Sequence, residues 1–293
     1  MLLQLLANGL VSGCPYSFIA LGFALIYNTT RIFHVSHGAV YTFSSYILYL
    51  FLIILRVPLL PSVFICLLLI PFMGIAIELL IYAPLERKGG SLLVALLSSL
   101  GFYIIVVNFI AMIFGNETKI LRPAIEKTFT FGSVILTRIQ VAQVLAFIIL
   151  VPVVLLLLKK TNWGKSIRAI RDNSTLAVVM GINQRMIRIS VFALGSALAA
   201  LAAMLQALDV GMDPHVGMPA LLTGAGAMII GGVQVFEGAV VGAFCLGIMQ
   251  GLIIWKISAR WVDAITFVIF ILFLVFKSEG LLGKRKRIEE TLS

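Results

Sequence analysis

The sequence predicts an all-α polytopic membrane protein with about nine transmembrane helices, built as a single domain over residues 1–293. Hydrophobic residues make up 61% of the chain. Charged residues make up only 12%, about half of the roughly 25% found in soluble chains. Continuous apolar runs such as 151–158 and 265–276 lack the alternation of a transmembrane β-barrel. Helices are therefore expected, because backbone in hydrocarbon must be hydrogen-bonded within its own segment.

The predicted spans are apolar runs near the length of roughly 20 residues that crosses a bilayer. In chain order they cover 5–27, 38–55, 59–82, 91–114, 139–158, 187–208, 218–233, 237–255 and 261–276. The run 218–233 is short and rich in Gly, so it either crosses the membrane or re-enters it as a half-helix. The sequences of 18–25 and 192–198 echo one another. Because the first span and the sixth would run in opposite directions, the echo predicts an inverted repeat.

The distribution of Lys and Arg predicts the orientation. The connections after the first, third and fifth spans, together with the basic tail 277–293, hold 15 of the 22 Lys and Arg residues, and the other face holds 7. Cytoplasmic loops carry the excess of these residues. We therefore expect the tail inside and the N-terminus outside. The same rule accounts for the net charge of +10 without a nucleic-acid partner.

Ionisable residues in the middle of a span usually mark proton or ion coupling. Here the candidates lie near span ends: Glu78, Asp209, Asp213 and Asp263. A proton-driven carrier is therefore not expected. A sodium-coupled carrier working without a partner stays open, since carbonyl groups alone can hold sodium.

No catalytic or cofactor-binding pattern is visible in the sequence. His34 and His37 could share a helix face, but they lack the Glu of a metalloprotease helix, so no metal is expected. The run Gly164-Lys165-Ser166 ends like a phosphate-binding loop, but residue 159 is Lys where that loop needs Gly. We expect no enzyme and no ATP bound by this chain. A membrane-embedded enzyme would need paired carboxylates or a His/Asp cluster at one face.

The connection 159–186 is the longest on the predicted inner face. Gly164 is expected to break the chain, and 166–171 then alternates Ile and Arg at helical spacing. Residues 172–174 offer N-cap chemistry for a second short helix, and Gly181 suits its C-terminal end.

Two interpretations of this connection stay open. It could be a solvated loop that touches lipid headgroups. It could also dock a soluble partner, with Leu176, Val179 and Met180 entering a groove and the arginines meeting an acidic rim.

Residues 164–183 resemble the coupling loop of branched-chain amino-acid ABC transporter permeases of the LivH type. Three other regions also resemble that family: 22–27 with Ser36-His37-Gly38, the glycine-rich 231–242, and 276–283. The similar segments follow the family order over nearly the whole chain. There are departures, because His34 stands where the family usually has Asn, and Gln234, Val235 and Glu237 replace a commoner Gly, Ser and Pro.

The resemblance implies the ABC importer permease fold, in the inner membrane of a bacterium. The substrate would be a branched-chain or other apolar amino acid, moved by alternating access, although the departures leave an amide, urea or a sugar open. The implied partners are a second permease subunit, two cytoplasmic ABC ATPase subunits that bind ATP and Mg, an extracytoplasmic solute-binding protein and membrane lipid. The residues expected to couple to the ATPase are Gly164, Arg168, Ala169, Asp172, Ala177, Met180, Gly181 and Ile182.

Seven residues are candidates for the substrate pathway or for helix packing: Ser36, His37, Gly38, Gly231, Gly232, Gly238 and Gly242. The glycines either let helices pack closely or form thin helices beside a pore. His37 either hydrogen-bonds backbone groups near Gly38 or lines the pathway and touches the substrate.

Overall fold

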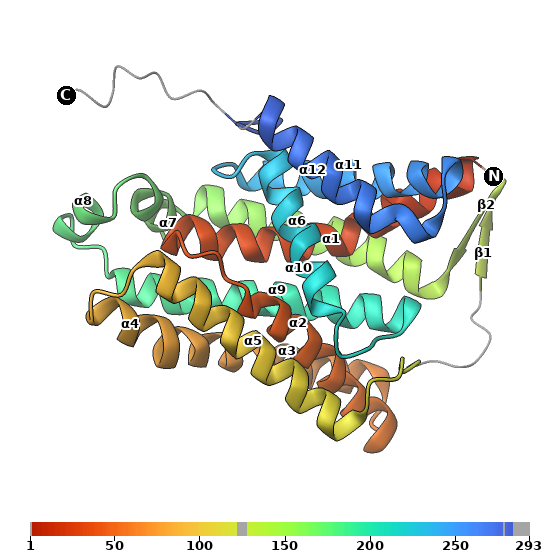
Figure 1. Ribbon diagram of the computed structural model, residues 1–293, viewed down its shortest axis with the longest axis horizontal. Coiled ribbons are helices and arrows are strands. Elements are labelled where there is room, and N and C mark those ends of the chain that lie inside the picture. The colour runs from red at the N-terminus through yellow and green to blue at the C-terminus, as the bar shows by residue number, and fades with distance from the viewer. Residues whose placement is uncertain (1, 122–127, 278, 284–293) are drawn as a thin grey trace.

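The computed structural model describes residues 2–121, 128–277 and 279–283. Figure 1 shows long helices lying side by side along the longest axis. The short helices α7 (Asn162–Asp172) and α8 (Ser174–Val179) lie at one end of this bundle. A hairpin of β1 (Thr128–Phe131) and β2 (Val134–Thr137) lies at the other end, beside the N-terminus. Most of the predicted basic tail falls outside the described residues.

The long helices follow one another with short connections. The first half contains α1 (Leu2–Thr30), α2 (Ser36–Tyr49) with the π-helix η1 (Leu50–Ile54), α3 (Leu59–Ile77) with the π-helix η2 (Glu78–Tyr82), α4 (Ala83–Arg87) and α5 (Leu92–Phe114). The second half contains α6 (Arg138–Lys160), α9 (Gln184–Val210), α10 (Gly217–Gly231), α11 (Phe236–Lys256), the 3₁₀ turn η3 (Ala259–Trp261) and α12 (Val262–Phe276).

A helix occupies each of the nine predicted spans, which confirms the all-helical membrane class. Within the described residues, seven helical segments are long and apolar enough to cross a membrane. The helices Gly217–Gly231 and Ala264–Phe276 are apolar but shorter. A total of nine crossings therefore stays a prediction.

The packing of the helices follows the pattern of an inverted repeat. α1 packs against α11 as α9 packs against α3, and α1 packs against α10 as α9 packs against α2. The two echoing segments meet where α1 crosses α9. A Cβ on Gly22 would lie 2.7 Å from the Gly195 carbonyl oxygen, and a Cβ on Gly195 would lie 3.0 Å from that of Gly22. Glycine is required on both sides because the two backbones touch.

The hairpin β1–β2, in the connection between α5 and α6, is the one sheet among the described residues, and the sequence analysis made no prediction for it. The strands pair antiparallel, from Thr128 opposite Thr137 to Phe131 opposite Val134. Gly132 in the turn has φ 62°, a conformation that glycine adopts without strain. The Gln4 side chain exchanges two hydrogen bonds of 2.8 Å with the backbone of Ile135, which ties the hairpin to the start of α1.

The buried core runs along α1, α2, α9 and α10, while α3, α5, α6 and α12 present apolar side chains to the outside. Phe72, Ile105, Val153 and Val275 are each about half exposed or more. Such a surface is unfavourable in water but suits contact with lipid tails.

Candidate functional site

A cavity of about 800 Å³ lies among the long helices. The helix ends that line it, such as the start of α1, are at the end of the bundle away from α7 and α8 (Figure 1). Its walls come from the first half of α1, the middle of α2, the last turns of α9 and α11, and the start of α10. Its volume falls in the range of roughly 300–1,000 Å³ that is usual for small-ligand sites. The cavity could therefore hold a molecule of the size of an amino acid.

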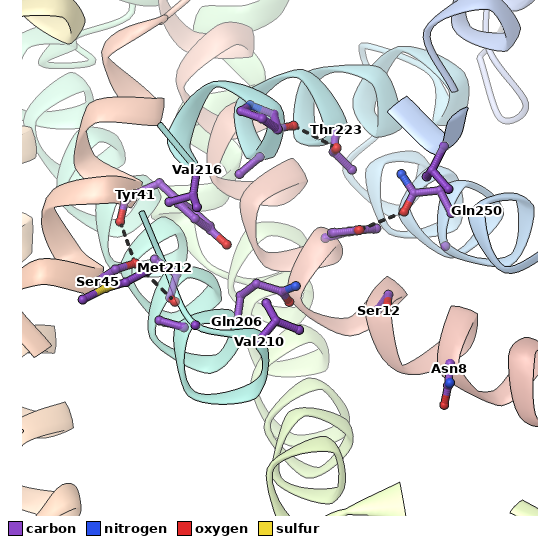
Figure 2. A pocket seen from close by; sticks show the side chains of 18 of the residues that line it. Asn8, Ser12, Tyr41, Ser45, Gln206, Val210, Met212, Val216, Thr223 and Gln250 are labelled. Atoms are coloured by element: carbon purple, nitrogen blue, oxygen red, sulfur yellow. Dashed lines mark hydrogen bonds between the residues drawn. The ribbon is translucent and has the colours of Figure 1, made fainter. Parts of the chain in front are cut away.

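Polar side chains from five helices face this cavity, as Figure 2 shows. They carry hydroxyl and amide groups, and they include Asn8, Ser12, Tyr16, Tyr41, Ser45, Gln206, Thr223 and Gln250. On α1 the polar residues recur every four positions, which places them on one face of the helix. The sequence analysis missed this stripe, although its spacing can be read from the sequence.

A hydrogen bond of 2.8 Å across the cavity joins α1 to α11, from the Tyr16 hydroxyl to Oε1 of Gln250. Gln250 is only 9% exposed, so its amide is held in place by this bond. A glycine contact lies beside it, because a Cβ on Gly9 would meet the Gly247 carbonyl oxygen at 2.6 Å. Small residues therefore bring the two helices together where the polar groups face the cavity.

The mouth of the cavity is bordered by the connection between α9 and α10. Met212 and Lys119 exchange backbone hydrogen bonds of 2.7 and 2.9 Å, so this connection is fixed to the segment after α5. The Asp213 carboxylate accepts a hydrogen bond from the His215 backbone at 2.8 Å. These residues bring ionisable groups to the rim, while hydroxyls and amides line the interior.

The residues predicted at the start of α2 are all fully buried and lie outside the cavity wall. The Ser36 backbone donates a hydrogen bond of 2.7 Å to the Ser99 hydroxyl. The His37 ring lies against the backbone of Ile19 on α1. A Cβ on Gly38 would lie 2.8 Å from the Gly217 carbonyl oxygen, so Gly38 lets the starts of α2 and α10 touch.

The predicted glycines of 231–242 lie where α10 meets α11. A Cβ on Gly231 would run into the Gly238 carbonyl, and a Cβ on Gly242 would run into that of Ala227. Gly232 has φ 115° and ends α10. These residues let the two helices pack closely, and they do not contribute to the wall of the cavity. Whether they also serve a pathway stays a prediction.

The connection 159–186 contains the two short helices that the sequence predicts. The Asn173 side chain accepts a hydrogen bond from the Leu176 backbone and caps α8. Gly181 ends this helix with φ 85°, as expected of a C-terminal glycine. The expectation that Gly164 breaks the chain is wrong, because Gly164 lies inside α7. A Cβ there would collide with the Leu158 carbonyl, so this glycine lets α7 fold back onto α6.

The predicted coupling residues divide into an exposed group and an anchoring group. Met180 is 76% exposed and its neighbour Val179 is 77% exposed. Asp172 is also exposed, and Ala169 and Ile182 are half-buried. Ala177 is buried, and its carbonyl accepts a hydrogen bond from the Ile182 backbone. We name the exposed apolar side chains of this end the α8 patch: Leu176, Val178, Val179 and Met180.

The arginines of α7 bind within the chain, whereas the docking interpretation of the sequence had them meet the acidic rim of a partner. The guanidinium of Arg168 donates hydrogen bonds to the carbonyls of Leu158 and Lys159 at the end of α6. Arg171 donates to the Gln234 carbonyl at 2.7 Å. Arg31, just after α1, donates to the Arg171 carbonyl at 2.9 Å. These bonds fix α7 to three other parts of the bundle.

A buried ion cluster, which the sequence analysis also missed, lies close to α8. Nε of Arg188 lies 2.7 Å from Oε1 of Glu78, and Nη2 donates to Oε2 at 3.1 Å. Arg188 also pairs with Glu86. The side chains of Arg188 and Glu78 are only 6% and 3% exposed. Because Arg188 belongs to the second turn of α9, the cluster joins the helix that follows α8 to the π-helix η2.

Comparison with known proteins gives a consistent result over the whole length. Residues 5–274 match the family model described as "Branched-chain amino acid transport system / permease component". The chain is 28% identical to the high-affinity branched-chain amino acid transport system permease protein BraD of Pseudomonas aeruginosa, covering 96% of each chain. It is 26% identical to LivH of Salmonella typhimurium, again over 96% of each chain. The solved structure of PsaBC from Streptococcus pneumoniae in complex with Fab aligns at 15% identity and TM-score 0.48, covering 94% of this chain and 90% of that one.

Proposed function

This chain belongs to the family of branched-chain amino acid transport permeases, and from that premise we propose that it is the membrane subunit of an ATP-driven importer for apolar amino acids. It is a multi-pass membrane protein of the transport class, and its relatives are named as permeases. In the proposed orientation the N-terminus and the cavity mouth lie outside the inner membrane of a bacterium. The α8 patch and the C-terminus then lie in the cytoplasm.

The cavity is the observation that carries this proposal. Its wall combines apolar side chains with a set of hydroxyl and amide groups, although the helices that form it are strongly apolar. Buried hydroxyl and amide groups replace some of the hydration that a zwitterion loses when it leaves water. The cavity can therefore receive the charged end of an amino acid from the outer face.

An apolar recess beside the cavity supports an aliphatic substrate. It has a volume of about 360 Å³ and shares Pro219, Thr223 and Gln250 with the cavity. The rest of its wall is mostly apolar, including Leu246 and Phe270. A branched aliphatic side chain would gain hydrophobic burial there, about 0.8 kcal/mol for each buried methylene, while its amino and carboxylate groups stay in the polar cavity.

The proposed partners follow from the other end of the bundle. The α8 patch is a small apolar surface held on a capped helix between two long spans. A short helix that lays its apolar side chains into a groove is a common mode of docking. We propose that a cytoplasmic ATPase subunit provides this groove. A second permease and an extracytoplasmic binding protein complete the importer, and ATP and Mg bind to the ATPase subunits.

Transport by the purified complex tests this proposal. The chain is produced with its partner subunits and placed in liposomes that contain ATP, with the binding protein and labelled leucine outside. We expect leucine to accumulate only with hydrolysable ATP, and unlabelled valine to compete where urea and glucose do not. Competition by urea or glucose, without competition by valine, would show that the substrate belongs to another class of solute. Uptake by the isolated chain without ATP would contradict the importer role.

A further inference from the structure

A cluster of six rings lies next to the cavity, on the side that faces α7 and α8. We call it the ring cluster, and it consists of Phe23, Phe33, His34, His37, Tyr82 and Phe192. His34 is at its centre, with ring centroids 5.1 Å from Phe192, 5.5 Å from Tyr82 and 5.6 Å from His37. These edge-to-face contacts make the cluster a tightly packed plug.

Helix periodicity places the ring cluster directly beyond the cavity wall. His37 lies one turn from the cavity residue Tyr41 on α2, and Phe23 lies two turns beyond Tyr16 on α1. Residues four or seven positions apart share one face of a helix. On both α1 and α2, a ring of the cluster therefore follows the cavity residues along the same helix face, towards the α8 end of the bundle.

The helix α9, which also lines the cavity, shows the same relationship as α1 and α2. On α9, Phe192 lies eleven positions before Ala203, which lines the cavity. Eleven residues make close to three helical turns, so these two residues also share a face. The ring cluster thus lies further along the same helix faces as the cavity, towards α8.

The two imidazoles of the ring cluster are fully buried, with few hydrogen-bond partners. His34 and His37 are 0% exposed. Nδ1 of His34 is 2.7 Å from the Tyr82 hydroxyl, whereas its Nε2 has no hydrogen-bond partner. The His37 ring interacts with the backbone of Ile19. Burial, followed by the neighbouring His37, lowers the pKa of His34 well below its ordinary value, so the ring is neutral. A buried polar atom without a partner costs about 1–3 kcal/mol.

We propose that the ring cluster is the closed inner half of the substrate path, with His37 and His34 lining that half when it opens. The proposal rests on the transport function above. In the open state Nε2 of His34 and the His37 ring meet water or the amino and carboxylate groups of the substrate. The burial that is unfavourable in the closed state is then relieved, which brings the closed and open states closer in free energy.

The link to α8 gives this half of the path a means of opening. Tyr82 is the last residue of the π-helix η2, and Glu78 is its first. Glu78 is held by Arg188 at the start of α9, directly after α8. A π-helix inside a longer helix often marks a functional site. A shift of α8 would therefore reach Tyr82 and Phe192 through short contacts on η2 and α9.

Thiol accessibility tests the proposal in the complete complex. Cys14, Cys66 and Cys245 are replaced by Ala, and single cysteines are introduced as Ser45→Cys in the cavity or His37→Cys in the ring cluster. A chain that retains only the buried Cys66, which is 0% exposed, serves as the control. We expect a membrane-impermeant thiol reagent to modify position 45 at rest, position 37 several-fold faster during ATP turnover than at rest, and Cys66 in neither condition.

Two results of this experiment would overturn the proposal. Equal modification of position 37 at rest and during turnover would mean that no closure exists there. Absence of modification in both conditions would mean that His37 is only a core residue. A failure of the importer role is separate, because it appears as a wild-type complex that does not accumulate leucine with ATP.

A leak measurement covers the case in which His37→Cys fails to fold. Phe192→Ala removes ring contacts to both His34 and Tyr82. We expect it to release preloaded leucine from liposomes several-fold faster than wild type without ATP. Phe147→Ala is the matched control, because it removes a ring contact of 4.9 Å to Phe244 outside the path. Equal leak from Phe192→Ala and Phe147→Ala would contradict the proposal.

Discussion

Gly22 of α1 and Gly195 of α9 lie back to back, so that a Cβ on either would crowd the carbonyl oxygen of the other, at 2.7 and 3.0 Å. The two glycines hold equivalent positions in the two echoing segments. Gly38 and Gly217, at the starts of α2 and α10, form a second reciprocal contact. The two halves of the bundle therefore meet through close backbone contacts at these glycines, where larger side chains would force the helices apart.

Substitution at the α1–α9 crossing should destabilise the bundle. Gly22→Ala places a methyl group against the Gly195 carbonyl, and overpacking of this kind costs about 1–3 kcal/mol. We expect a lower midpoint of thermal unfolding in detergent. Gly101→Ala is the control, because a Cβ at Gly101 in α5 meets nothing within 4 Å. If both variants unfold at the wild-type temperature, the crossing is looser than described.

The ion cluster predicts a large effect that a second substitution relieves. Arg188→Met leaves the buried Glu78 carboxylate with its charge uncompensated, which costs about 3–5 kcal/mol. The double variant Arg188→Met with Glu78→Leu removes both buried charges, and we expect it to recover most of the stability. Thermal unfolding of Arg188→Met, the single variant Glu78→Leu and the double variant forms a double-mutant cycle. Additive losses would show that the two side chains do not interact.

The bond across the cavity predicts matching effects on uptake. Tyr16→Phe and Gln250→Leu both remove the hydrogen bond between α1 and α11, and both reduce the polarity of the cavity wall. We expect each to lower leucine uptake several-fold while the complex still assembles. Glu117→Gln is the control, because that side chain is 91% exposed and does not line the cavity. Wild-type uptake by both cavity variants would argue against the cavity as the path.

Much of the fold could be predicted from the sequence because apolar length and charge determine where helices cross a membrane. All nine apolar runs are helical, and the short helix at 174–179 begins at the Asn173 cap and ends near Gly181. The caps were predictable because they are local chemistry. Gly164 was misread because its role depends on the approach of α7 to the end of α6, which no local pattern encodes.

The site was less predictable than the fold. The cavity joins residues more than two hundred positions apart, such as Tyr16 and Gln250, so only the tertiary structure brings them together. The pairing of Arg188 with Glu78 is also long-range. The polar stripe on α1 was visible in principle, but Asn8, Ser12 and Tyr16 are separated by small and apolar residues. In a sequence this apolar, such a stripe is easily taken for a packing face.

The central claim is that a conformational change of a partner ATPase is transmitted to this chain through the α8 patch. A charge at Val179 tests this claim most directly. This side chain is 77% exposed, so Val179→Asp should leave the membrane fold intact while placing a carboxylate in the proposed apolar groove. The decisive measurement is ATP-driven leucine uptake by liposomes that contain the complete complex. We predict that Val179→Asp abolishes uptake and weakens copurification of the ATPase, with the thermal unfolding of the permease unchanged. Uptake at the wild-type rate would contradict the account.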